Sequence, residues 1–236
     1  MNIKTTFFVN GISGQPNSDI GARVSIYDAA GIATLKRAMA EGHQLCSHTW
    51  SHQSLISRND YNITYEMTRL NQAFKQIIGK IPTCVRPPFG DIGNNAAKIL
   101  QAMGYAPDSN GGKAGIILWN MDPVDYNPSI HGTGAVNQIN DMLNEYKLQL
   151  NPPANLGLPS IDSTFTGGVI GSPSTISLMH DIWSTTADFR PNGLIIPKQT
   201  VPLTQKAVEY LKTKGYQMVR IDECLGFPID SMVCNF

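Results

Sequence analysis

The sequence predicts an α/β fold, with a (β/α) barrel as the leading architecture. Short apolar or β-branched runs alternate with longer segments whose apolar residues recur at helical spacing. This alternation indicates parallel strands joined by crossover helices. Polar clusters directly follow several of the strands, as in barrels whose strand ends form one functional face. Because 236 residues suit one barrel, we expect residues 1–236 to form a single domain.

The first expected elements are a strand, a helix and a second strand. β-branched and aromatic residues at 5–9 precede Asn10-Gly11, which is typical of a strand that ends at a turn. Apolar residues then recur at helical spacing over 29–41, and Gly42 ends this helix. The short apolar segment 43–46 follows as a strand. The unit is therefore strand, loop, helix, strand.

The same alternation continues to the end of the chain. An apolar stripe predicts a helix at 61–78, which ends at Gly79 and is followed by a strand at 83–85. Further helices are expected at 94–103, 133–146 and 201–213, and further strands at 115–119, 175–179 and 216–221. Residues 149–174, rich in Pro, Gly and Ser, are expected to form a long surface loop.

Composition and charge argue against several classes of function. Eighteen basic residues balance eighteen acidic ones, so no net charge favours nucleic acid or an anionic membrane surface, and a neutral substrate fits better. No apolar run approaches the roughly 18 residues of a membrane span. The sequence contains neither G-x-S-x-G nor a phosphate-binding glycine loop, which argues against serine-triad and nucleotide chemistry.

The polar clusters after the predicted strands are the main functional signal. They comprise residues 47–52, residues 86–91, residues 120–126 and His180-Asp181. Strands of a parallel barrel open on one face, so we expect these clusters to converge there. Within the first cluster, His48 and His52 at i, i+4 on one helical turn would face the same way and could bind one divalent metal. The alternative is a pair of surface or capping histidines.

The other clusters offer one cation, two carboxylates and a third imidazole. Arg86 precedes two prolines and could hold a carboxylate on the barrel rim, or it could be an ordinary surface arginine. Asp122 and Asp125 could be functional carboxylates or turn-forming residues. His180 could act as a general acid if a carboxylate holds its other nitrogen, or it could be a satisfied core histidine.

Taken in this order, the clusters resemble those of the polysaccharide deacetylases of carbohydrate esterase family four, particularly fungal chitin deacetylases. The likeness extends over nearly the whole chain, through residues 6–11, 42–52, 86–90, 178–181 and 223–226. It implies a distorted or incomplete (β/α) barrel. It also implies a divalent metal, most commonly zinc, and a substrate of chitin or other N-acetylglucosamine polymers.

The resemblance also implies roles for individual residues. His48 and His52 would be metal ligands, and His180 would be the general acid. Arg86 would orient the catalytic base, with Asp122 or Asp125 supporting Arg86 or His180. The backbone N–H of Phe89 would bind the oxyanion, and Leu178 would line the pocket for the acetyl methyl group. Further substrate contacts would come from Trp50, Gly90 and Tyr126, the last of which stands where the family often has tryptophan.

One family motif is not found in this sequence. The Thr-Phe-Asp-Asp-Gly-Pro stretch, which carries the catalytic base and a third metal ligand, would lie before the strand at 5–9, which begins close to Met1. We therefore expect weak metal binding and low deacetylation by this chain alone. The alternative function is an inactive carbohydrate-binding relative.

The resemblance to this family also has implications for localisation and for the cysteines. Members of the family are mostly secreted or wall-associated, although residues 1–9 lack a signal-like apolar core. Asn62-Ile63-Thr64 is a glycosylation triplet compatible with secretion. Cys224 resembles a family cysteine whose partner would lie in the missing segment, so it is expected to be free or bonded to Cys234.

Overall fold

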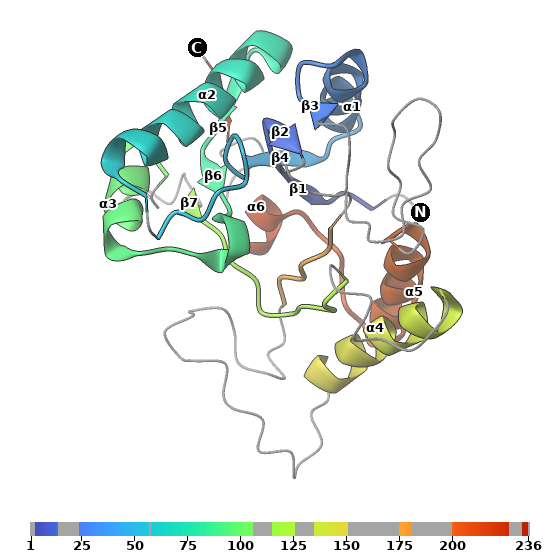
Figure 1. The fold of residues 1–236 in the computed structure, drawn as a ribbon. Helices are drawn as coiled ribbons and strands as arrows, with labels where there is room; N and C mark the ends of the chain where they lie inside the picture. Colours follow the sequence, from blue (N-terminus) through green and yellow to red (C-terminus); the bar gives the residue numbers. More distant parts are fainter. Residues whose placement is uncertain are drawn as a thin grey trace. The chain divides into compact units, whose positions relative to one another are not determined.

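A computed structural model describes residues 3–13, 24–56, 58–105, 115–125, 135–150, 175–180, 200–226 and 233–235 (Figure 1). The chain divides into two units. The first unit comprises Met1–Ile117 and Met218–Phe236, and the second comprises Leu118–Gln217. Each unit is described by itself.

The centre of the first unit is a parallel sheet in the order β1-β4-β6-β7. Its strands are β1 (Thr6–Val9), β4 (Gln44–Ser47), β6 (Cys84–Val85) and β7 (Gly115–Ile116). Each neighbouring pair is parallel. This partial parallel sheet confirms the predicted α/β class and fits an incomplete (β/α) barrel.

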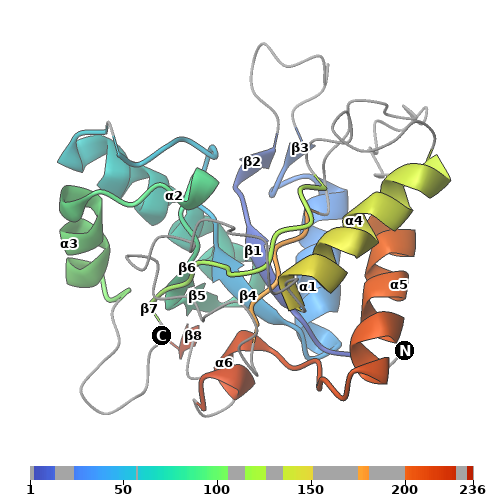
Figure 2. The same cartoon turned by 90° about the horizontal axis from the view of Figure 1, so that it is seen from below.

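Three helices of the first unit connect and cover these strands. They are α1 (Ala29–Ala40), α2 (Asp60–Ile78) and α3 (Asn94–Ala102), each within a few residues of its predicted range. The Asn59 side chain accepts a hydrogen bond from the Asn62 backbone N–H at the start of α2, and Gly79 ends this helix with φ of 73°. Of these helices, α2 contacts both α3 and α1, and Figure 2 shows α3 beside α2.

The apolar core of the first unit lies between these helices and the sheet. On α2 the buried apolar residues recur every three or four positions. One cluster joins Leu70 and Phe74 of α2 to Leu35 and Leu45, and a second joins Met67 to Val85 and Leu100. Among the described helices, none is both long and apolar enough to span a membrane.

Two antiparallel pairs of short strands were not predicted. β2 (Ile12–Ser13) pairs with β3 (Val24–Ser25), and β5 (Lys80–Pro82) pairs with β8 (Val233–Asn235). A short 3₁₀ turn, η1 (Pro88–Gly90), follows β6. These segments were too short to give a period in the sequence.

The predicted strand at 216–221 is wrong. A short helix, α6 (Ile221–Cys224), begins at its last residue. The Ile221 backbone N–H donates to Thr6 Oγ1 at 3.0 Å, and the Asp222 N–H donates to Gln44 Oε1 at 3.3 Å. These bonds place the start of α6 against the beginnings of β1 and β4.

A buried ion pair accompanies α6. The Arg220 guanidinium donates to both carboxylate oxygens of Asp222, at 3.0 Å and 2.8 Å, and to the Gly42 carbonyl at 3.1 Å. Both side chains are almost fully buried. Apolar residues at 216, 218, 219 and 221 suggested a strand. The backbone N–H groups of residues 221 and 222 and the Arg220 side chain instead find their partners at the start of a helix.

The second unit contains two described helices, α4 (Ala135–Leu150) and α5 (Thr200–Thr213). They lie side by side in Figures 1 and 2, with Met121, Tyr146 and Ala207 in a common core. The predicted strand 175–179 is reduced to one parallel bridge between Met121 and Ser177. Most of the expected loop at 149–174 lies outside the described residues.

A disulfide joins Cys46 of β4 to Cys84 of β6. This pairing could not be predicted from the sequence, because the two cysteines are 38 positions apart and become neighbours only through the parallel sheet. In the chain-entropy view, closing a loop of this length stabilises the folded state by about 3–4 kcal/mol. Cys224 is a free, exposed thiol, and the side chain of Cys234 lies outside the described part.

Candidate active site

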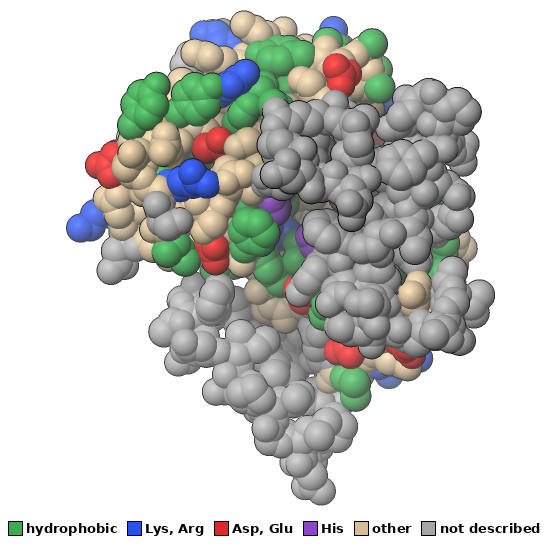
Figure 3. Space-filling model, viewed as in Figure 1, with side chains coloured by type: hydrophobic (Ala, Val, Ile, Leu, Met, Phe, Trp, Pro, Cys, Tyr) green, Lys and Arg blue, Asp and Glu red, His purple; other side chains and the backbone are tan. Residues whose placement is uncertain are grey.

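The loop after β4 brings the two predicted metal-binding histidines together. The ring centroids of His48 and His52 are 4.8 Å apart. His48 Nδ1 lies 2.6 Å from the Arg86 carbonyl oxygen. A carbonyl can only accept, so Nδ1 carries the proton and the lone pair of the neutral ring is on Nε2. Histidine side chains are visible at the molecular surface in Figure 3.

The histidines are not on a helical turn, and that part of the prediction is wrong. Residues 48–52 form a loop in which Thr49 and His52 have left-handed backbones, with φ of 67° and 55°. The buried Thr49 hydroxyl makes no hydrogen bond to the described residues. Left-handed non-glycine residues and an unsatisfied hydroxyl both cost free energy, so the surrounding contacts must hold this loop in place.

Two side chains from neighbouring elements hold this loop. The Asn10 side-chain amide donates to the carbonyl oxygens of His48 at 2.5 Å and of Thr49 at 3.2 Å. The Glu66 carboxylate, buried on α2, accepts from the backbone N–H of Ser51 at 2.7 Å and from its hydroxyl at 2.6 Å. The backbone leading into His52 is therefore fixed by a buried carboxylate.

Sequence reasoning missed Glu66. Its signal was a charged residue within the apolar stripe of α2, three positions after Ile63 and next to Met67, both of which are fully buried. A charge on such a stripe needs a specific partner. The partner is a loop residue that the sequence did not place near α2.

Arg86 is buried, so the surface-arginine alternative is wrong. Its exposed fraction is 5%, its Cζ lies 3.9 Å from the centre of the Phe8 ring, and its Nε is 3.4 Å from the Ile117 carbonyl oxygen. Burial of a guanidinium over an aromatic face is favourable only where polar partners complete its shell. Its pairing with Asp122 or Asp125 stays a prediction.

The segment after Arg86 turns sharply at the residues expected to contact substrate. Phe89 is exposed with φ of 60°, and Gly90 is buried with φ of 72°. The Phe89 ring lies 4.8 Å from that of His52, edge to face. Ser54 Oγ donates to Asp91 Oδ2 at 2.5 Å, which ties the two loops together. The oxyanion role of the Phe89 N–H stays a prediction.

Trp50 does not fit the predicted role of a substrate contact. Its side chain is only 3% exposed and belongs to the core cluster of Leu70 and Phe74. The Arg69 Cζ lies 4.1 Å above the ring. A Cβ added to Gly11 would lie only 2.0 Å from a carbon of the indole. The ring faces that would stack on a sugar are therefore covered by protein.

In the second unit, Asp125 holds His180. The buried Asp125 carboxylate accepts from the His180 backbone N–H and from its Nδ1, both at 2.7 Å. Asp125 is thus the carboxylate expected within hydrogen-bond reach of His180. The bond places the proton of the neutral ring on Nδ1 and leaves Nε2 as the second protonation site.

Asp122 forms a turn, as the alternative interpretation of this residue proposed. Its Oδ1 accepts from the Val124 backbone N–H at 2.8 Å, and its Oδ2 accepts from Trp119 Nε1 at 3.2 Å. Val124, between the two aspartates, has φ of 55°. Burial raises the pKa of the Asp122 carboxyl, with a smaller contribution from the Asp125 charge, while the bond from Val124 opposes the shift.

Three further residues complete the comparison with the sequence. Leu178 is buried, with its backbone N–H donating to the Met121 carbonyl at 2.8 Å, and its role beside an acetyl group stays a prediction. Tyr126 and Asp181 lie outside the described residues. The prediction that all the candidate side chains share one rim spans both units and also stays a prediction.

The histidine pair fits a divalent metal as two of its donors. Both imidazoles come from one loop with adjacent rings, and the backbone carbonyl on His48 Nδ1 is the type of outer-shell contact that orients a ligating histidine. Within the described ranges, no group of three or more His, Cys, Asp or Glu side chains could hold a metal.

Comparison with known proteins finds a matching family and several relatives. The family model for polysaccharide deacetylases matches residues 1–107. A chitin deacetylase of Pestalotiopsis is 30% identical over 224 residues, which are 95% of this chain and 55% of that protein. Residues 1–107 of this chain thus match the polysaccharide deacetylase family, and nearly the whole chain is similar to a chitin deacetylase. The chain spans about half the length of that relative.

Two further comparisons involve a second member of the family. The chitin deacetylase of Colletotrichum lindemuthianum is 26% identical over 225 residues, 95% of this chain and 70% of that protein. Its solved structure matches 100% of this chain and 81% of that chain, with a TM-score of 0.72 and 24% identity. This structural likeness supports the fold described above.

Proposed function

We propose that this protein removes acetyl groups from N-acetylglucosamine-containing polysaccharides such as chitin. The observation that carries the proposal is the His48–His52 pair, with His48 oriented by the Arg86 carbonyl, in a chain whose residues 1–107 match the polysaccharide deacetylase family. The relatives named as chitin deacetylases support the choice of polymer. The neutral net charge agrees with an uncharged substrate.

In this proposal, His48 and His52 hold a divalent metal ion, and the preference of zinc for imidazole ligands favours zinc. When bound, the metal supplies Lewis-acid polarisation of the acetamide carbonyl. The chain fixes the tautomer of His48 through the Arg86 carbonyl and fixes the backbone before His52 through Glu66. The backbone N–H of Phe89, a residue with a left-handed backbone, is the donor that we propose for the oxyanion.

His180 is the proposed general acid. Asp125 binds the backbone N–H and Nδ1 of His180, so the ring cannot turn and its Nε2–H can be given to the leaving amine. The His180 side chain is 27% exposed and that of Asp125 is 4% exposed. The proton donor is therefore accessible, and the carboxylate that orients it is shielded from water.

We further propose that the protein acts outside the cell or at the cell wall. A disulfide between two strands of the core forms and persists in oxidising compartments. The resemblance to chitin deacetylases, which implies a secreted or wall-associated protein, supports this location.

The test is acetate release from N-acetylglucosamine hexamer with added zinc. Wild type should release acetate, at the low rate expected from the sequence, and His48→Ala and His52→Ala should each abolish the release. Asp125→Asn should lower kcat by about 10²–10⁴, because the orientation of the general acid is lost. His43→Ala is the matched control, since His43 pairs with the Thr5 backbone N–H and should leave acetate release unchanged.

Binding of the hexamer is measured in the same samples. Binding without acetate release by wild type would overturn the deacetylase proposal and support a carbohydrate-binding function. Acetate release that persists in both histidine variants would overturn the assignment of the metal ligands.

A further inference from the structure

The Cys46–Cys84 disulfide lies directly below the candidate metal-binding loop in the sheet. Cys46 is two residues before His48, and Cys84 is two residues before Arg86. Residues two apart share a face of a strand. Because Ser47 pairs with Val85, the two cysteines stand opposite each other on β4 and β6. The disulfide therefore joins the two strands two residues before His48 on β4 and two residues before Arg86 on β6.

The backbone connection between β4 and β6 is short at this point. β1 and β4 share four register pairs, whereas β4 and β6 share one. The Arg86 N–H donates to the Ser47 carbonyl at 3.0 Å. With so short a ladder, the relative position of the two strands depends strongly on other links between them. The disulfide is a covalent link of this kind.

The position of β6 relative to β4 decides the orientation of His48. The His48 ring is on the β4 side, and the carbonyl that accepts its Nδ1–H belongs to Arg86 on the β6 side. A shift of about 1 Å between the strands would stretch this bond from 2.6 Å beyond hydrogen-bonding distance. The ring would then lose the contact that selects its tautomer.

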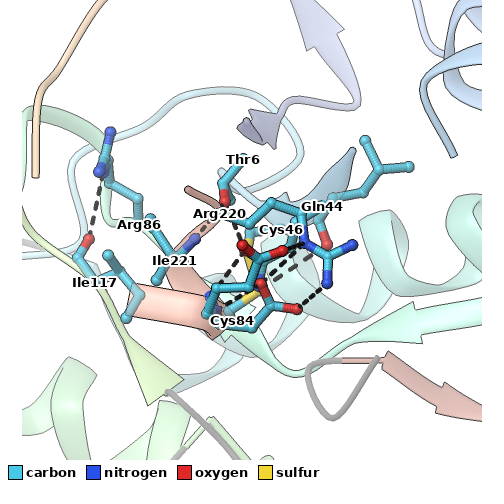
Figure 4. The surroundings of a disulfide bond; sticks show 11 residues. Thr6, Gln44, Cys46, Cys84, Arg86, Ile117, Arg220 and Ile221 are labelled. Atoms are coloured by element: carbon cyan, nitrogen blue, oxygen red, sulfur yellow. Dashed lines mark hydrogen bonds and ion pairs between the residues drawn. A yellow bond between two sulfur atoms is a disulfide. The ribbon is translucent and has the colours of Figure 1, made fainter. Parts of the chain in front are cut away.

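The disulfide itself is rigidly surrounded. Both half-cystines have 0% exposure. The Gln44 side-chain nitrogen lies 3.9 Å from Cys84 Sγ, and Gln44 is bonded to Thr6 and to the start of α6. Figure 4 shows the bond with this network and Arg220 close to it, and Arg86 directed away toward Ile117. Burial shields the bond from reductants in the folded protein, which indicates a structural disulfide that stays oxidised.

We propose that the Cys46–Cys84 disulfide is a positioning device that holds β4 and β6 together so that the Arg86 carbonyl orients His48. The two thiols lose two protons and two electrons as the S–S bond forms, and a disulfide of a thiol oxidase or of oxidised glutathione is reduced to two thiols. The inference rests on the proposed function only in treating His48 and His52 as metal ligands.

The experiment compares wild type with Cys46→Ala/Cys84→Ala and with Cys46→Val/Cys84→Ala, which refills part of the lost volume. Nitrogen-15 NMR of the His48 ring reports its tautomer, and calorimetry measures affinity for zinc alone. Wild type should show the Nδ1–H tautomer. Both variants should show mixed tautomers and bind zinc about 10–100-fold more weakly, the usual effect of losing an outer-shell contact.

Leu35→Ala is the control for a general loss of stability. Leu35 is a buried residue of α1 in the same unit, and its removal should lower the Tm without changing the tautomer or zinc affinity. If a folded disulfide variant keeps both properties of wild type, the proposal is overturned. If wild type releases no acetate but its tautomer depends on the disulfide, the proposed function fails and this inference stands.

Discussion

The loop that carries His48 and His52 depends on Glu66. Glu66→Ala leaves the Ser51 backbone N–H and hydroxyl without their shared acceptor, and a hydrogen bond to a charged group contributes about 1.5–3 kcal/mol. We expect Glu66→Ala to lower the free energy of unfolding by that amount and to weaken zinc binding. Glu66→Gln keeps one acceptor oxygen and should retain most of both. Urea unfolding and calorimetry measure the two effects, and equal losses in the two variants would contradict the role of Glu66.

Asp122 should contribute a specific pH dependence to stability. Burial raises its pKa in the folded state, so the folded protein binds this proton more tightly than the unfolded chain, whose value is about 3.9. Stability from this group is therefore greatest at low pH and falls as pH rises from the unfolded pKa through the folded one.

Asp122→Asn removes this titration and also the acceptor for Trp119, which adds an offset that does not depend on pH. Urea unfolding between pH 3 and pH 7 should show wild type losing stability relative to Asp122→Asn as pH rises. Glu41, whose pKa Arg37 lowers, has the opposite slope but is present in both proteins and cancels. A constant difference across this range would be inconsistent with the shift.

Single residues show what the sequence could and could not determine. The polar clusters correctly indicated that His48 would meet His52 and that His180 would have a carboxylate partner. Whether Asp125 or Asp122 binds His180 depends on a turn in which Val124 has a left-handed backbone. A non-glycine residue in the sequence does not indicate that conformation. Burial of Trp50 depends on a contact with Gly11, 39 positions earlier in the sequence.

At the scale of elements, the end of β1 is fixed by the contact of Gly11 with Trp50. The Gly11 N–H donates to the Thr49 carbonyl, and the next N–H donates to the Trp50 carbonyl, so the backbone cannot move away from the indole. Gly11→Ala should therefore lower the free energy of unfolding by about 1–3 kcal/mol through overpacking. In a Trp50→Ala background the same change should cost little. Additive losses in this double-mutant cycle, measured by urea unfolding, would show that the contact does not limit position 11.

Long periodic elements were predicted well, and short ones were not. α1, α2 and α5 begin within one residue of the predicted positions, because an apolar stripe over several turns is a strong signal. Segments such as 216–221 are too short for a period to decide between strand and helix. There the hydrogen bonds of Thr6 and Gln44 to α6 determine the structure, and these partners are more than 170 positions away.

At the scale of the whole molecule, the last part of the first unit returns to its beginning. Ile221 binds Thr6 across 215 positions, and Arg220 binds the Gly42 carbonyl across 178. Contacts between residues so far apart in sequence cost loop-closure entropy, and they form late in folding unless strong interactions offset that cost. The buried Arg220–Asp222 pair, with hydrogen bonds on both partners, is the strongest candidate for that interaction.

Asp222→Ala should therefore destabilise the first unit by about 3–5 kcal/mol, because it leaves the Arg220 charge buried without its main partner. Arg220→Met/Asp222→Leu removes both charges and should cost much less. The exposed Arg37–Glu41 pair is the control, and Glu41→Ala should change stability little. Urea unfolding measures all three, with hydrogen exchange at the Ile221 and Asp222 amides reporting release of α6. If the double variant is as unstable as Asp222→Ala, the cost comes from lost hydrogen bonds or packing around α6 rather than from the unpaired charge.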